Sequence, residues 1–109
     1  MDTWESLMNT LEKMFGKKPE SLESIFFLIG MQELGRVEED FSKEQKQDIL
    51  HIGICTVLGK AEYYTFAGRD EEGWPHYTPT KVLPSMTSTE EETFLKKYIL
   101  LYFEDKKIN

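Results

Sequence analysis

Apolar residues recur at helical spacing in four stretches of the chain, which predicts four α-helices. We expect these helices at about residues 3–15, 20–34, 42–60 and 88–104. The first and last stretches confine their apolar side chains to one face, as amphipathic helices do. The second stretch contains five apolar residues in a row, Ile25–Ile29, and is therefore expected to form the buried centre of the fold.

The ends of the predicted helices carry residues that favour helix capping. Ser42 and Gln45 match a capping box, in which side chains and backbone amides bond reciprocally. Asp2 is the expected N-cap of the first helix, and Gly16 and Gly35 follow helices where a left-handed residue ends them. The fourth helix has two overlapping candidate capping boxes, Ser88 with Glu91 and Thr89 with Glu92.

Two glycines lie inside predicted helices, Gly30 in the second and Gly53 in the third. A glycine in a helix interior costs about 1 kcal/mol relative to alanine, so a compensating interaction is expected. We expect both glycines to face another helix, where the missing side chains let the second and third helices approach closely.

An aromatic segment at about residues 63–82 separates the third helix from the fourth. Within it, Asp70 to Gly73 can form a type I turn that ends in a left-handed glycine, which predicts a short β-hairpin. An extended segment is the alternative. Pro75 and Pro79 cannot donate backbone hydrogen bonds, so the second arm is expected to be an edge strand or merely extended.

These elements predict a mainly α fold, a four-helix bundle-like single domain over residues 1–109 with the hairpin or extended segment between its third and fourth helices. Three helices followed by a hairpin also match the order of a winged-helix module, which requires a basic third helix to bind nucleic acid. The third helix and its end are neutral, because three lysines are balanced by three acidic residues: Lys43, Lys46 and Lys60 against Glu44, Asp48 and Glu62.

Charge and cysteine content narrow the classes of function. The 109 residues include 13 basic and 20 acidic ones, a net charge of −7, which disfavours nucleic acid as a partner. The single cysteine excludes an internal disulfide and a multi-cysteine zinc site. No apolar stretch approaches the roughly 20 residues of a membrane span, so no membrane partner is expected. The acidic N-terminal residues lack the order of a signal peptide, which together with the unpaired thiol predicts a cytoplasmic location.

A polar stripe along the third helix carries three side chains that bind metals. Asp48, His51 and Cys55 lie on successive turns, and His76 of the hairpin is a candidate fourth ligand for a divalent transition metal. The alternative is structural, with Cys55 in the core and the other two residues at its margin. No recognised metal motif has this spacing, and no other cofactor is expected.

The sequence lacks phosphate-binding glycine loops, nucleophile elbows and related enzyme motifs. Cys55 with His51 or His76 is the combination that resembles a nucleophile and its base. A reactive thiol needs an exposed, electropositive setting, which the middle of an apolar helix does not provide. We therefore expect a protein that is not an enzyme.

The hairpin gathers side chains suited to a ligand or partner surface: Arg69, Asp70, Trp74, His76 and Tyr77. Arginine can bind an anion, and tryptophan can stack on a ligand or anchor a partner. The alternative is a charged turn whose aromatic side chains pack onto the helices.

The helices also carry many aromatic side chains, and a small domain buries only part of its surface, so some of them are available for a second subunit. The alternative is that all of them fit into one core. We therefore expect a small non-enzymatic protein that acts through contact with itself, as a homodimer, or with another protein. The alternatives are a metal- or small-ligand-binding protein or minor enzyme built on the third-helix stripe, and a winged-helix-like module.

Three segments together resemble a family of short bacterial cytoplasmic proteins of unknown function: Phe27–Gly35, Phe41–Ile52 and Gly68–His76. The resemblance implies a bacterial source. It implies no activity and no role for any residue.

Overall fold

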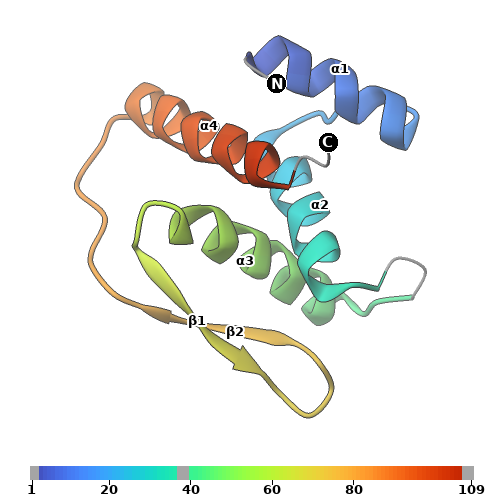
Figure 1. The fold of residues 1–109 in the computed structure, drawn as a ribbon, viewed down its shortest axis with the longest axis vertical. Coiled ribbons are helices and arrows are strands. Elements are labelled where there is room, and N and C mark those ends of the chain that lie inside the picture. The colour runs from blue at the N-terminus through green and yellow to red at the C-terminus, as the bar shows by residue number, and fades with distance from the viewer. Residues whose placement is uncertain (1–2, 37–39, 107–109) are drawn as a thin grey trace. The chain divides into compact units, whose positions relative to one another are not determined.

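The computed structural model describes residues 3–36 and 40–106. Within them it contains four helices and a two-stranded sheet (Figure 1). The elements, in chain order, are α1 (Trp4–Phe15), α2 (Leu22–Leu34), α3 (Lys43–Gly59), β1 (Tyr64–Arg69), β2 (Pro75–Pro79) and α4 (Ser88–Asp105). The predicted mainly helical fold, with a hairpin between the third and fourth helices, is confirmed.

The elements fall into two compact units. One unit joins Met1–Glu20 with Pro84–Asn109, and the other is Ser21–Leu83. In the first unit α1 packs against α4, and in the second both α2 and the hairpin pack against α3. A four-helix bundle arranged around α2 is not confirmed, because the helix packing of α2 is concentrated on α3.

Capping at the helix ends agrees with the sequence at most positions. Ser42 and Gln45 form the expected box, with backbone-to-side-chain bonds of 3.1 and 2.9 Å. Gly16 and Gly35 are left-handed and end α1 and α2. Thr3 caps α1, whereas the expected cap, Asp2, lies outside the described residues.

The capping box of α4 differs from the prediction. It is formed by Thr87 and Glu90, so the pairs that begin at Ser88 and Thr89 are wrong. Three consecutive glutamates follow three consecutive hydroxyl residues here, and each of three registers satisfies the capping pattern.

The helices α2 and α3 cross at two glycines. A Cβ atom added to Gly30 would lie 2.0 Å from the carbonyl oxygen of Ile49, and one added to Gly53 would lie 1.8 Å from that of Phe26. Gly30 therefore faces Ile49, one helical turn before Gly53, and Gly53 faces Phe26, one helical turn before Gly30. The expectation that both glycines face another helix is confirmed, and the contact brings Cα–H groups against carbonyl oxygens.

The hairpin has the predicted turn. The Gly73 backbone N–H donates to the Asp70 carbonyl at 3.0 Å, and Gly73 has a φ of 88°. The strands are antiparallel, with a bulge between Phe66 and Gly68. The Tyr77 side chain on β2 shares a 2.8 Å hydrogen bond with Thr56 of α3, which joins the sheet to the helix.

Replacing Gly30 or Gly53 by alanine is expected to lower the free energy of unfolding by about 1–3 kcal/mol, because the new methyl group overlaps a backbone carbonyl. Helix propensity alone would make alanine stabilising by about 1 kcal/mol. The sign of the change in the free energy of unfolding therefore shows whether helix propensity or overlap with the carbonyl dominates. Urea unfolding followed by circular dichroism measures the change. Gly59→Ala is the matched control, since its Cβ would lie 3.4 Å from the backbone carbonyl oxygen of Tyr64, an ordinary contact distance. Unchanged stability in both test variants would contradict the close crossing.

Candidate functional site

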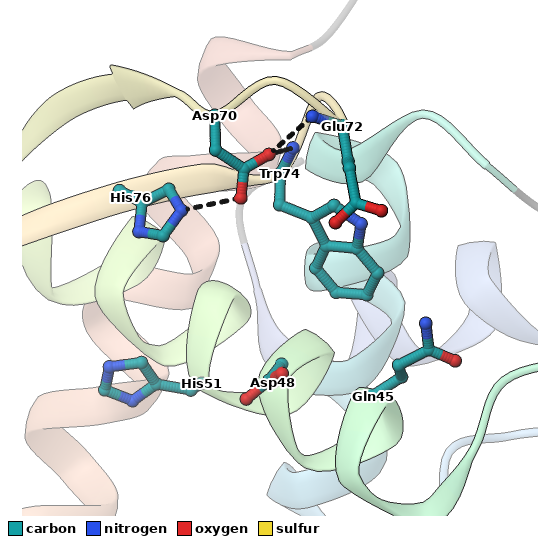
Figure 2. A pocket seen from close by; sticks show the side chains of 7 residues that line it. All are labelled: Gln45, Asp48, His51, Asp70, Glu72, Trp74 and His76. Carbon is teal, nitrogen blue, oxygen red and sulfur yellow. Dashed lines mark hydrogen bonds and ion pairs between the residues drawn. The ribbon is translucent and has the colours of Figure 1, made fainter.

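One carboxylate organises the hairpin turn. Asp70 Oδ1 accepts hydrogen bonds from the backbone amides of Glu72 at 3.0 Å and Trp74 at 2.9 Å. Asp70 Oδ2 lies 2.9 Å from His76 Nε2 (Figure 2). The bond with His76, followed by the backbone bonds, lowers the pKa of Asp70 below its usual value. Asp70 is therefore ionised at neutral pH, where it holds the turn and orients the imidazole.

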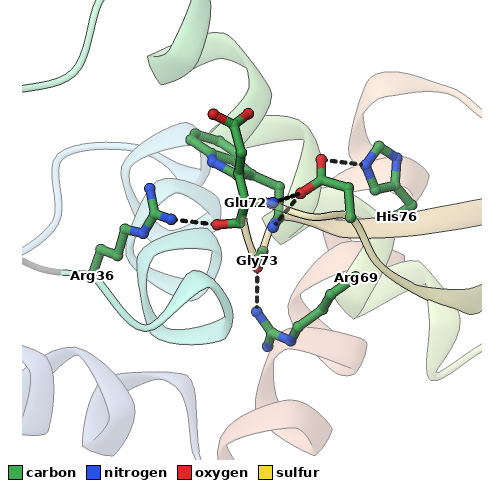
Figure 3. Close-up of polar contacts among 7 residues, drawn as sticks. Arg36, Arg69, Glu72, Gly73 and His76 are labelled. Atoms are coloured by element: carbon green, nitrogen blue, oxygen red, sulfur yellow. Dashed lines mark hydrogen bonds and ion pairs between the residues drawn. The ribbon is translucent and has the colours of Figure 1, made fainter.

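Two arginines tie the turn to the end of α2 and to the hairpin itself (Figure 3). Arg36, just beyond α2, donates to the carbonyl of Glu72. Arg69 donates to the carbonyls of Gly73 at 2.8 Å and Glu33 at 2.6 Å. The guanidinium of Arg69, which the sequence suggested for anion binding, thus bonds two main-chain oxygens in this structure.

A cleft of about 400 Å³ lies between α3 and the hairpin. Figure 2 shows the Trp74 ring extending from the turn towards α3, which presents Gln45, Asp48 and His51 on one face. The lining residues are Gln45, Asp48, His51, Asp70, Glu72, Trp74 and His76.

The ring of Trp74 is held by two neighbours. The Phe41 ring meets it nearly edge-on, with centroids 6.1 Å apart, and the Arg36 guanidinium lies 5.9 Å from its centroid. The second contact has the geometry of a cation–π interaction. The tryptophan is therefore a positioned wall of the cleft.

Acidic side chains predominate among the charged groups of the cleft. Within residues 3–36 and 40–106, its lining includes three carboxylates, two imidazoles and no lysine or arginine. Carboxylates that share a partly enclosed space attract a cation more strongly than they would in bulk water. The chemistry of the lining therefore suits a positively charged ligand group.

Three of the four candidate metal ligands line this cleft, namely Asp48, His51 and His76. The fourth, Cys55, is fully buried, with its Sγ 3.3 Å from Nε2 of His51. Among residues 3–36 and 40–106, no three His, Cys, Asp or Glu side chains are grouped closely enough to hold a metal ion. A metal would thus have to draw these side chains together.

Three of the five candidate surface residues of the hairpin line the cleft, and the other two form hydrogen bonds that hold the hairpin in place. Asp70, Trp74 and His76 line the cleft, whereas Arg69 bonds backbone carbonyls and Tyr77 bonds Thr56. Burial raises the pKa of Tyr77, in keeping with its place against α3.

The interpretation of the sequence missed three residues of this region, Gln45, Glu72 and Arg36. Gln45 was recognisable only as a capping residue, and its Oε1 does accept the Ser42 amide. Glu72 was recognisable as a turn residue. Arg36 follows the glycine that ends α2, and no sequence signal connects it with a turn 36 residues away.

Comparison of the chain with protein-family models, with curated proteins and with solved structures gives no match. No helix in the described part of the chain is long and apolar enough to cross a membrane.

Burial raises the pKa of the Cys55 thiol from 9.0 to about 11, so the thiol is protonated at neutral pH. The raised pKa also makes the free energy of unfolding fall as the pH rises from about 9 towards 11.

At mildly alkaline pH we expect native Cys55 to react with an aromatic disulfide reagent about a hundredfold more slowly than the unfolded chain does. The reason is that raising the pKa by two units lowers the fraction of reactive thiolate about a hundredfold.

The absorbance of the aromatic thiol that the reagent releases measures the rate of reaction of Cys55. The variant Cys55→Ser gives the background rate. A native rate equal to the unfolded rate would contradict the buried, protonated thiol and would favour Cys55 as a nucleophile.

Proposed function

We propose that the protein is a non-enzymatic interaction module that binds a positively charged side chain of a partner protein in the cleft between α3 and the hairpin. The observation that carries the proposal is the lining of the cleft, which among the described residues combines three carboxylates with a tryptophan and includes no lysine or arginine. Carboxylates and an aromatic face are the two kinds of group that attract organic cations.

Arginine fits this lining better than lysine. Its planar guanidinium donates to several carboxylate oxygens at once and also stacks on aromatic rings, whereas the lysine ammonium is a compact and strongly hydrated charge. Asp48 lies on α3, and Asp70 and Glu72 lie on the turn, so the acceptors surround the cleft from two elements.

The turn is already shaped before a ligand binds. Asp70 bonds two backbone amides, and the arginines on either side bond backbone carbonyls of Glu72 and Gly73. Such preorganisation reduces the conformational entropy lost on binding, which supports a binding role for the turn.

The partner we propose is either a second copy of the chain or another protein with an exposed arginine. An apolar side chain on the same hairpin supports protein contact: Phe66 is 54% exposed and packs against the Tyr77 ring, with centroids 5.7 Å apart. Apolar side chains beside a polar cleft are typical of protein interfaces. A homodimer and a cytoplasmic location both remain our expectations.

Acetyl-arginine amide is expected to bind the cleft weakly, in the millimolar range that about −4 kcal/mol represents. The double variant Asp48→Asn/Glu72→Gln should bind about tenfold or more weakly, because it removes two charged hydrogen-bond acceptors. Isothermal titration calorimetry measures both affinities.

The matched control is Glu44→Gln/Glu71→Gln, which changes the net charge equally at exposed positions outside the cleft lining. Equal weakening in the control, or binding of acetyl-glutamate amide as tight as that of the arginine probe, would overturn the proposal.

Metal binding is a second candidate function, favoured by the bond between Asp70 and His76. A carboxylate that orients an imidazole is the usual support of a metal-binding histidine. His51 and Asp48 line the same cleft from α3, so closure of the hairpin onto the helix would add them as ligands.

If the cleft binds metal, cobalt(II) should give a visible absorption band that His76→Gln removes, whereas the exposed change Glu44→Gln should leave it intact. Absorption spectroscopy of the titrated protein tests this directly. Absence of any band at equimolar cobalt and protein would contradict the second candidate.

A winged-helix-like nucleic-acid module receives less support. The face of α3 towards the hairpin carries Asp48, and the hairpin places Asp70 and Glu72 across from it. These carboxylates would repel a phosphate backbone.

A further inference from the structure

A second cleft, of about 340 Å³, lies along a different face of α3, where the N-terminal halves of α2 and α3 meet. From α2 it is lined by Glu23, Ser24 and Phe27, and from α3 by Lys43, Lys46, Gln47 and Leu50. These α3 residues recur at helical spacing and lie on a different face from those that line the cleft beside the hairpin. The basic side chains of α3, Lys43 and Lys46, therefore line the second cleft, whereas its acidic Asp48 lines the cleft beside the hairpin.

This cleft combines apolar and cationic side chains, which are the two kinds that bind an amphipathic anion. Phe27 and Leu50 are partly exposed and provide apolar surface, and Ser24 and Gln47 provide hydrogen-bonding groups. Lys43 and Lys46 lie one turn apart on α3, and within the described residues neither forms an ion pair. Their ammonium groups can therefore meet a ligand without first breaking an ion pair.

The balance of charge indicates a ligand with a single negative charge. Among the residues that the structure describes, two lysines and one carboxylate, Glu23, line the cleft, which leaves one positive charge unmatched. A dianion would gain little from the second charge, because Glu23 would oppose it.

We propose that this second cleft binds a small amphipathic carboxylate, such as a medium-chain fatty acid. The apolar body would cover Phe27 and Leu50, and the carboxylate would lie between Lys43 and Lys46. The volume of about 340 Å³ is at the lower end of the range typical of small-ligand pockets. The proposal rests on a separate cleft and does not depend on the function proposed above.

Titration of isotope-labelled protein with octanoate, followed by two-dimensional NMR, tests the proposal. Saturable shifts are expected at the amides of Ser24, Phe27, Gln47 and Leu50. Octanol, which keeps the apolar body and lacks the charge, should bind at least about fivefold more weakly.

The variant Lys43→Gln/Lys46→Gln should weaken octanoate binding by about five- to tenfold. The control Lys17→Gln/Lys18→Gln removes the same charge at exposed positions outside this cleft and should bind as the unchanged protein does. Circular dichroism checks that each variant is folded.

Three results would overturn the proposal: no saturable octanoate binding, equal binding of octanol, or equal weakening in the control variant. Binding of an acidic peptide that contains Glu and Leu, without binding of octanoate, would also overturn it and would assign the cleft to a partner protein.

Discussion

The close crossing of α2 and α3 is the contact on which the rest of the Ser21–Leu83 unit depends. Gly30 and Gly53 bring each helix against a backbone carbonyl of the other, nearer than any side chain would allow. The neighbouring residues Ile29, Ile49 and Ile52 are buried as a result. The cost of two helix-interior glycines is thus offset by packing that no larger residue could reach. This crossing fixes α3, and both clefts use α3 as a wall.

Polar contacts help to attach the hairpin to this pair of helices. Tyr77 bonds α3, Arg36 and Arg69 connect the turn with the end of α2, and Asp70 holds the turn together. Most of these groups are partly exposed, so each contact contributes modestly. Together they keep the acidic turn facing Asp48 instead of allowing the carboxylates to separate. Such an arrangement of like charges is unfavourable by itself and becomes favourable when a cation binds between them.

Local signals in the sequence predicted the local structure well. Helical periodicity predicted α1 to α4, the Ser42–Gln45 box predicted the start of α3, and the Asp70–Gly73 turn predicted the hairpin. The two glycines even predicted the crossing of α2 and α3, because their cost needed compensation. The division into two units was not predicted, since an apolar stretch such as Ile25–Ile29 indicates burial without naming the helix that buries it.

Contacts between distant positions were the part of the site that the sequence could not predict. Angular spacing correctly placed Asp48 and His51 on one face of α3, but it also grouped Cys55 with them, and the structure buries that thiol. The role of Arg36 depends on a turn far along the chain, and that of Gln45 on the position of the hairpin. Helical periodicity describes one helix at a time. It therefore cannot reveal which residues of the hairpin lie opposite α3.

The central claim is that the cleft between α3 and the hairpin receives a basic side chain, and the most direct test is an NMR titration of labelled protein with acetyl-arginine amide. We expect saturable shifts confined to the amides of residues 45–51 and 70–76, together with the indole N–H of Trp74. Shifts confined to other parts of the chain, or no saturable shift, would contradict the account.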